Sequence, residues 1–81
     1  MELKDTIEMM QSADYKERFK AEYYQTKTRY ERLLAMLMKY EAKQLDFEPT
    51  CPIKILYEQA EIMSKYLKVL ETRALIEGVS L

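Results

Sequence analysis

Glycine and proline, the residues that most often interrupt helices and form turns, are almost absent from this sequence. Its 81 residues include one glycine, Gly78, near the carboxyl end, and two prolines, Pro49 and Pro52, within one short segment. Sheets and tight turns need more of these residues than the sequence provides. We therefore predict an all-α chain with a single firm break, near the two prolines.

Apolar and semi-apolar residues recur with alternating spacings of four and three on both sides of this break, which is the periodicity of one helix face. Before the break they are Phe19, Tyr23, Thr26, Tyr30, Leu33, Leu37 and Tyr40. After the break they are Ile53, Leu56, Ala60, Met63, Leu67, Leu70 and Ala74. The two patterns predict a long antiparallel helical hairpin, with helices at about 14–45 and 52–77.

The ends of these helices have candidate capping residues. A shorter pattern of Leu3, Ile7 and Met10 predicts a first helix at about 2–11. Before the next helix, Ser12 and Asp14 are candidate caps, and Glu17 lies at the capping-box position after Asp14. Pro52 suits the first turn of the last helix, with Thr50 or Cys51 near its cap. Gly78 suits the position after its last turn. Residues 1–81 would form a single helical domain.

The chain is short for a domain that is stable alone, since a chain of this size buries only a little over roughly 60% of its unfolded surface. The single cysteine, Cys51, excludes an internal disulfide, and without histidine a structural zinc site is not expected. The second long helix also carries a further apolar edge, formed by Ile55, Tyr57, Ile62, Tyr66, Val69 and Ile76, and the first long helix adds Tyr15, Tyr24, Met36 and Met38. We expect a symmetric homo-oligomer that covers this edge. The alternative is that the short first helix covers much of it.

The charge balance also restricts the partners. The formal net charge is −1 with 33% charged residues, which argues against a dedicated DNA or RNA binder. The amino-terminal residues "MELKDTIEMM" do not form a signal peptide, and no apolar run approaches the roughly 18 residues that span a bilayer. We expect a cytoplasmic protein without a membrane partner, and the lone cysteine fits a reducing compartment.

No residue pattern in the chain indicates catalysis. There is no glycine-rich phosphate loop and no histidine for a serine or cysteine nucleophile. Asp46 and Glu48 lie in the predicted connection. We interpret them as solvated surface carboxylates rather than as an acid–base catalytic pair. The methionines suit adaptable packing rather than metal binding. We therefore expect a chain that is not an enzyme and holds no cofactor or metal.

Basic residues and tyrosines alternate in the segment "DYKERFKAEYYQTKTRYERL", residues 14–33. Arginine can bind a phosphate with two parallel hydrogen bonds, and the face of a tyrosine can stack on a nucleobase. Tyr15, Arg18 and Glu22 are spaced by three and four, which places them on one face of a helix. Two interpretations remain open for these residues. They form either a surface ion pair beside a packed tyrosine or a site for a flat anionic ligand.

Two longer spacings resemble those of a known family. The first is Asp14-Tyr15-x-Glu17-Arg18-Phe19, followed by Glu22 and by Arg29-Tyr30-x-Arg32-Leu33. The second is Ile55-Leu56-x-x-Gln59-x-x-x-Met63-x-x-Tyr66-x-x-x-Leu70-x-x-Arg73. Together, over roughly residues 12–77, they resemble a family of small helical phage and prophage proteins named after a gene of a crAss-like gut phage.

That family's hairpin is similar to the hairpin of phage sponges, which sequester the cyclic nucleotide signals of the bacterial CBASS and Thoeris defences. The sponges are symmetric oligomers that bind the signal between protomers, with an aromatic ring on a base and basic side chains on phosphates. They carry a tyrosine followed about fifteen residues later by a lysine, and a Gln-x-x-x-Met segment. Here Tyr15 precedes Arg29, and Gln59 precedes Met63, whereas Asp14 replaces the glycine that sponges have before the tyrosine.

The resemblance implies an anti-defence protein in the cytoplasm of an infected bacterial cell. It would bind a cyclic oligonucleotide or a cyclic ADP-ribose isomer and sequester it without cleavage. Two alternatives remain: an adaptor or inhibitor that binds a host protein, and a structural helical module of the phage particle. The ligand-binding residues that the resemblance implies are Tyr15, Arg18, Glu22, Lys27, Arg29, Gln59, Tyr66 and Arg73.

Within this set, each residue type implies a role. Tyr15 would stack on a base, and the basic residues Arg18, Lys27 and Arg29 would contact phosphates. Glu22 would orient Arg18 or accept a hydrogen bond from a base edge. The remaining contacts would come from the neighbouring helix, through Tyr66 and Arg73.

Overall fold

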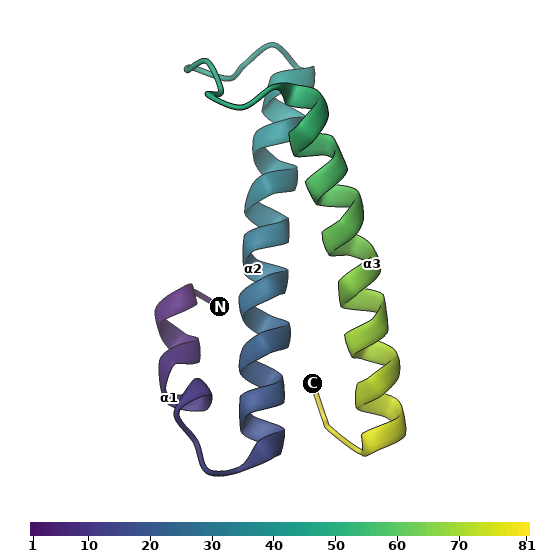
Figure 1. Ribbon diagram of the computed structural model, residues 1–81. Coiled ribbons are helices and arrows are strands. Elements are labelled where there is room, and N and C mark those ends of the chain that lie inside the picture. The colour runs from purple at the N-terminus through teal and green to yellow at the C-terminus, as the bar shows by residue number, and fades with distance from the viewer.

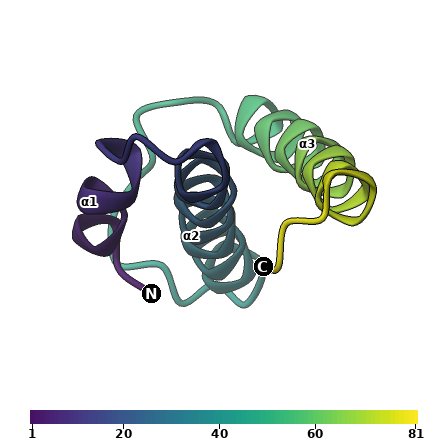
Figure 2. The same ribbon diagram turned by 90° about the horizontal axis from the view of Figure 1, so that it is seen from below.

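The computed structural model describes residues 1–81 and consists of helices joined by short connections. A 3-10 helix, η1 (Leu3–Thr6), continues into α1 (Ile7–Met10), and two long helices follow, α2 (Tyr15–Glu41) and α3 (Ile53–Glu77). Seen end-on, α2 lies between α1 and α3 (Figure 2). The predicted all-α class is therefore confirmed.

The two long helices pack side by side and run in opposite directions (Figure 1). Side-chain hydrogen bonds mark this pairing along its length. Near the chain ends, the Tyr23 hydroxyl donates to Glu71 at 2.7 Å, and near the connection the Tyr57 hydroxyl donates to Glu41. Both tyrosines are thereby held against the facing helix by a carboxylate.

The core lies between these helices in the half nearest the chain ends. Its residues are Phe19, Tyr23, Leu67, Leu70, Ala74 and Val79. All but Val79 belong to the two spacing patterns of the sequence. The helices diverge toward this end, and the carboxyl-terminal tail turns back between them (Figure 1). Phe19, Tyr23 and Val79 are buried in this half, whereas small Ala60 is buried in the half of α3 nearer the connection.

The amino-terminal segment packs on α2 alone. Both η1 and α1 contact α2, and neither contacts α3. Thr28 Oγ1 donates to the Met1 carbonyl at 3.3 Å, and Thr6 and Ala21 are both 0% exposed. The alternative in which the first helix covers the apolar edge of α3 is therefore wrong, because this segment lies on the opposite side of α2 (Figure 2).

The start of α2 uses both candidate caps. Asp14 is the N-cap, and its Oδ1 accepts a hydrogen bond from the Lys16 N–H at 3.0 Å. Ser12 Oγ accepts from the Asp14 N–H at 3.0 Å. Glu17, expected to complete a capping box, instead forms an ion pair with Lys20 at 3.5 Å. These bonds satisfy N–H groups that would otherwise lack partners at a helix start.

The helix α2 ends at Glu41 rather than near residue 45. The reason is a left-handed residue, Lys43, with a φ of 58°. Its N–H donates to the Tyr40 carbonyl at 3.0 Å, and the Gln44 N–H donates to the Lys39 carbonyl at 2.8 Å. This is a Schellman motif, which closes a helix by satisfying its last carbonyls.

The ends of α3 agree only in part with the sequence. Its N-cap is Pro52, without a side-chain cap, so neither Thr50 nor Cys51 caps the helix. At the other end Gly78 has a φ of 71°, and the Val79 N–H donates to the Ala74 carbonyl at 2.9 Å. This turn directs Val79 into the core, so it positions the tail as well as ending the helix.

Two substitutions at these turns are expected to change stability in opposite directions. Gly78→Ala should lower the free energy of unfolding by about 1 kcal/mol, because a side chain makes the left-handed conformation unfavourable. No atom lies within 4 Å of the added Cβ, so the effect would be conformational.

Lys43→Gly should raise the free energy of unfolding by up to about 1 kcal/mol, because glycine adopts the left-handed conformation of this position without the penalty of a side chain. Urea unfolding measures both, and destabilisation by Lys43→Gly would contradict this account.

Candidate functional site

Three polar side chains meet where the start of α2 lies beside the end of α3. The Tyr15 hydroxyl donates to Glu77 Oε1 at 2.6 Å. Arg73 donates through Nη2 to the Tyr15 hydroxyl at 2.6 Å and through Nε to Glu77 Oε2 at 2.8 Å. Tyr15, Arg73 and Glu77 thus form a closed ring of hydrogen bonds between the helices, which we call the end cluster.

The buried ring of Phe19 packs against the end cluster. The guanidinium carbon of Arg73 lies 4.9 Å from the centroid of the Phe19 ring, a cation–π distance. The Tyr15 and Phe19 ring centroids are 6.3 Å apart, with their planes tilted by 58°. Phe19 is part of the core. The functional groups of the end cluster are therefore fixed to the packed interior, although they face solvent themselves.

The contacts set the charges of the end cluster. Hydrogen bonds from Arg73 and then from Tyr15 hold the pKa of the Glu77 carboxyl below its usual range. The hydrogen bond to Glu77, followed by partial desolvation, raises the pKa of Tyr15. The same Glu77 contact raises the pKa of Arg73. At neutral pH the end cluster therefore holds one cation, one anion and one neutral hydroxyl.

Arg73 keeps hydrogen-bonding capacity in this arrangement. A guanidinium has five N–H donors, and two of those of Arg73 are used within the end cluster. Its side chain is 42% exposed, so the remaining donors can reach an outside acceptor. A planar cation fixed at its inner edge and free at its outer edge suits a phosphate or carboxylate.

A second pair lies further along the same helices. The Tyr66 hydroxyl donates to Glu22 Oε2, which joins α3 to α2. Glu22 therefore does not orient Arg18, as the sequence suggested. Arg18 donates through Nη1 to the Ser12 carbonyl at 2.9 Å, toward the connection before α2. The helix spacing placed Arg18 and Glu22 side by side, but each side chain has its own partner away from the other.

The structure thus brings together four of the predicted residues, Tyr15, Glu22, Tyr66 and Arg73. The other four lie elsewhere on the chain. Lys27 lies over the Tyr23 ring, 5.8 Å from its centroid, and Gln59 Nε2 donates to the sulfur of Met63 at 3.8 Å. The remaining two residues are Arg18 and Arg29.

Arg29 is exposed and lies fourteen residues after Tyr15. The helix rise separates these positions by roughly 21 Å. Within one chain, the sponge-like pair of Tyr15 and Arg29 therefore does not belong to one side-chain cluster.

Glu77 is a member of the end cluster that the sequence analysis missed. Its position four residues after Arg73 is the spacing of a helical ion pair, and this signal was available in the sequence. No comparable spacing placed Phe19 beside the end cluster, because the spacing pattern assigned Phe19 to the core alone. Lys16 lies near the end cluster, and its Nζ donates to the Gly78 carbonyl at 3.3 Å.

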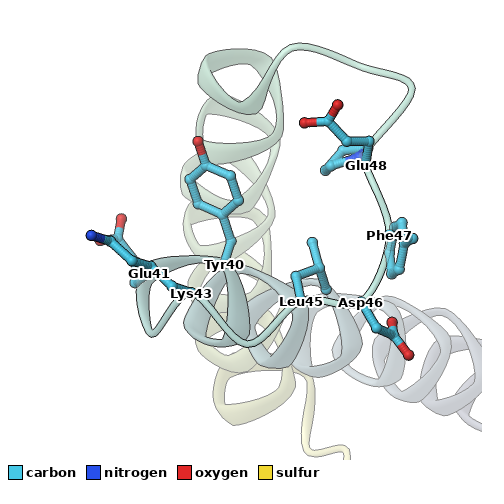
Figure 3. A pocket seen from close by; sticks show the side chains of 8 residues that line it. Tyr40, Glu41, Lys43, Leu45, Asp46, Phe47 and Glu48 are labelled. Carbon is cyan, nitrogen blue, oxygen red and sulfur yellow. The ribbon is translucent and has the colours of Figure 1, made fainter.

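One hollow lies at the α2–α3 connection, away from the end cluster. It has a volume of about 710 Å³. The side chains of Tyr40 and Leu45 point into the curve of the connection (Figure 3). None of the eight predicted residues lines it, and its three carboxylates exceed its one lysine, a net charge of −2. This hollow is therefore unfavourable for an anionic ligand. Its lining residues are Tyr40, Glu41, Lys43, Leu45, Asp46, Phe47, Glu48 and Pro49.

A smaller hollow of about 360 Å³ lies between α2 and α3 beside Lys27. Lys27 and Lys68 face Glu31 and Glu71 there, so its charges balance. Burial and the hydrogen bond to Glu71 raise the pKa of its Tyr23 to about 12, so this tyrosine is a hydrogen-bond donor at neutral pH. Lys27 is the only predicted residue in this hollow, which lacks an arginine.

No group of three or more histidine, cysteine, aspartate or glutamate side chains is arranged to hold a metal ion. No helix combines the length and the apolar character needed to cross a bilayer.

Comparison with known proteins places the chain in a family. Searches of curated proteins and of solved structures found no match. A family model described as Sequestin matches residues 13–76, which include both long helices apart from Glu77. The matched segment is 64 of the 81 residues and contains all eight predicted ligand-binding residues. The chain therefore belongs to the Sequestin family.

Proposed function

We propose that this chain is a phage-encoded anti-defence protein that sequesters a cyclic nucleotide immune signal. The signal would be a cyclic oligonucleotide or a cyclic ADP-ribose isomer, held without cleavage in the cytoplasm of an infected bacterial cell. The protein would act as a symmetric homo-oligomer and not as an enzyme. The family name Sequestin supports a sequestering role. The ligand class rests on the resemblance to phage sponges and on the chemistry of the end cluster.

The observation that carries this proposal is the pairing of Tyr15 with Arg73 across the two helices. A nucleotide ligand needs a flat surface for its base and a cation for its phosphate. The half-exposed ring of Tyr15 supplies the first, and the outer N–H groups of Arg73 supply the second. Sequestration requires burial and no bond cleavage, so no catalytic group is needed.

Isothermal titration with cyclic dinucleotides, cyclic trinucleotides and cyclic ADP-ribose isomers tests the proposal. We expect tight binding of at least one of these compounds. Heat denaturation of the complex should then release the same compound, with unchanged mass and unchanged chromatographic mobility. Absence of binding across the whole panel would overturn the ligand class, and recovery of a cleaved product would overturn sequestration.

Glu77→Gln is expected to tighten the binding of an anionic ligand. The Glu77 carboxylate offsets the charge of Arg73 and would repel a phosphate at the same place. Removing this charge at contact distance near the protein surface should raise the affinity for an anion roughly fivefold or more. Titration of this variant beside Glu71→Gln, a carboxylate on the same helix outside the end cluster, provides the measurement. Weaker binding by Glu77→Gln alone would show that Glu77 contacts the ligand favourably.

A second function, binding to a host protein as an adaptor or inhibitor, is favoured by one observation. Large apolar side chains remain exposed along α3, including Leu75 at 87%. Such surfaces commonly mark protein interfaces. Purification from infected cells separates the two functions, since an adaptor would retain a host protein and release no nucleotide on heating.

A further inference from the structure

A row of basic side chains lies on α2, outside the seam that packs against α3. Arg29, Arg32, Met36 and Lys39 follow one another with steps of three, four and three, so they share one face of the helix. The three basic residues are exposed, and Met36 is half-buried. The helix rise makes this row roughly 15 Å long. We call these four residues the basic stripe.

The cations of the basic stripe are not neutralised within the chain. None of them forms an ion pair. None has an aspartate or glutamate three or four positions away on the helix, which is the spacing that allows such a pair. The ion pairs within α2 and α3 all use this spacing: Lys20 with Glu17, Lys65 with Glu61, and Arg73 with Glu77. The positive charge of the basic stripe is therefore available to an acceptor outside the chain.

Neighbouring segments limit the basic stripe at both ends. Gln25 lies four positions before Arg29 on the same face, and its Nε2 donates to Met10 Sδ at 3.5 Å. The amino-terminal segment therefore covers the start of this face. After Lys39 the helix soon ends, and the connection extends toward the side of α2 on which α1 lies (Figures 1 and 2). The exposed part of the face is thus a short segment between two other parts of the chain.

A hollow of about 410 Å³ lies between the basic stripe and the connection. Arg32 and Lys39 line it together with a single carboxylate, that of Asp46, so its net charge is +1. By contrast, the hollow inside the curve of the connection has a net charge of −2. Half of the eight lining residues are apolar, namely Ala35, Met36, Leu45 and Phe47. We call this the stripe hollow, and it has room for a large apolar side chain bordered by cations.

We propose that the basic stripe binds an acidic helical segment of another protein. Carboxylates of that segment would lie on Arg29, Arg32 and Lys39, and one large apolar side chain would enter the stripe hollow. Arginine binds a carboxylate with two parallel hydrogen bonds. A helix presents side chains three and four positions apart to one groove, so an acidic helix can match the spacing of the basic stripe.

Other occupants match this surface less well. A second copy of the chain, related by a two-fold axis, would place the same basic residues against each other, which is unfavourable. A nucleic acid has no aliphatic side chain for the stripe hollow, and a net charge of −1 on the chain does not attract a long polyanion. A short acidic helix contacts the basic stripe alone and complements both its charge and its hollow.

This inference does not rest on the proposed function. The end cluster contains Tyr15 of α2, and the helix rise places Arg29, the nearest member of the basic stripe, roughly 21 Å from Tyr15. An acidic helix on the basic stripe and a nucleotide at the end cluster would therefore occupy different parts of the chain.

Fluorescence anisotropy of the full chain with labelled peptides tests the basic stripe. The probe is a short alanine-based helix, stapled to keep it helical, with glutamates at the spacing of the three cations and a leucine between them. We expect a dissociation constant on the order of 1–100 μM, rising with salt concentration. The same helix with glutamine in place of each glutamate should bind at least roughly tenfold more weakly.

Two charge reversals locate the peptide on the chain. Arg32→Glu should weaken binding of the acidic peptide at least roughly tenfold, because it places a like charge at the centre of the basic stripe. Lys65→Glu is the matched control, since Lys65 is exposed on α3 and lies outside the basic stripe. It makes the same change in net charge and should leave the affinity unchanged. Far-ultraviolet circular dichroism verifies that both variants keep their helices.

Each outcome supports or overturns the inference. Absence of binding by the acidic peptide overturns it, and so does binding that Arg32→Glu leaves unchanged. Tighter binding of a single-stranded oligothymidylate than of the acidic peptide would also overturn it, and would identify the basic stripe as a nucleic-acid surface. Failure of the proposed function has a different result, in which the chain binds the acidic peptide but no nucleotide of the panel.

Discussion

Replacing Leu70 by alanine is expected to lower the free energy of unfolding by about 2–5 kcal/mol. Leu70 is 1% exposed and lies in the core between α2 and α3. The substitution removes apolar burial and leaves a cavity that rigid neighbours fill only in part. A chain of this length has a total stability of roughly 4–12 kcal/mol, so the loss would be a large share of it. Urea unfolding followed by circular dichroism measures the change.

Leu75→Ala is the matched control for this substitution. The residue type and the helix are the same, but Leu75 is 87% exposed. Its replacement should change the free energy of unfolding by less than about 0.5 kcal/mol. Equal effects at the two positions would mean that α3 does not pack against α2 through the face that contains Leu70.

Replacing Arg73 by alanine is expected to weaken nucleotide binding by roughly 10–100-fold, the usual effect of losing hydrogen bonds to a charged group. Arg73 lies on the Phe19 ring and donates to Tyr15 and Glu77, which hold its outer N–H groups in a fixed direction. Arg73→Lys should recover part of the affinity, because it keeps the charge and loses the planar fork. Isothermal titration with the compound that binds the wild-type chain measures both effects.

Arg32→Ala is the control for a general loss of positive charge. Arg32 is exposed on α2 and belongs to none of the predicted nucleotide contacts. Because the proposed protein acts as a homo-oligomer, the native mass of each variant must be measured beside its affinity. Unchanged affinity in an Arg73→Ala variant that keeps its fold and assembly would remove the end cluster as the binding site.

The grouping of the candidate residues has a simple structural cause. Tyr66 and Arg73 were expected to supply ligand contacts from the neighbouring helix, which stays a prediction, and in the structure they contact Glu22 and Tyr15 of the first long helix. The helix spacing determines which residues share a face, and two antiparallel helices then bring their opposite ends together. The sequence could not determine which side chain each polar group would choose. Glu22 had Arg18 within reach on its own helix and instead accepts from Tyr66 on the other.

The helix boundaries were also predictable only in part. Asp14 was predictable as a cap because its short side chain reaches the N–H groups of the following turn. The early end of α2 was not, because Lys43 has no intrinsic preference for the left-handed conformation that it adopts. Its turn is stabilised by the hydrogen bonds of Lys43 and Gln44 to the last carbonyls of the helix.

The sequence by itself determined that the chain is all-helical, that its two spacing patterns would face each other, and that α3 has an apolar edge left over. These properties follow from local periodicity and from the scarcity of glycine and proline. Only the tertiary structure decided that the tail fills the core with Val79 and that the first helix packs away from α3. It also decided that Glu77 joins Tyr15 to Arg73. Those contacts depend on how far the helices diverge, a distance that no local pattern specifies.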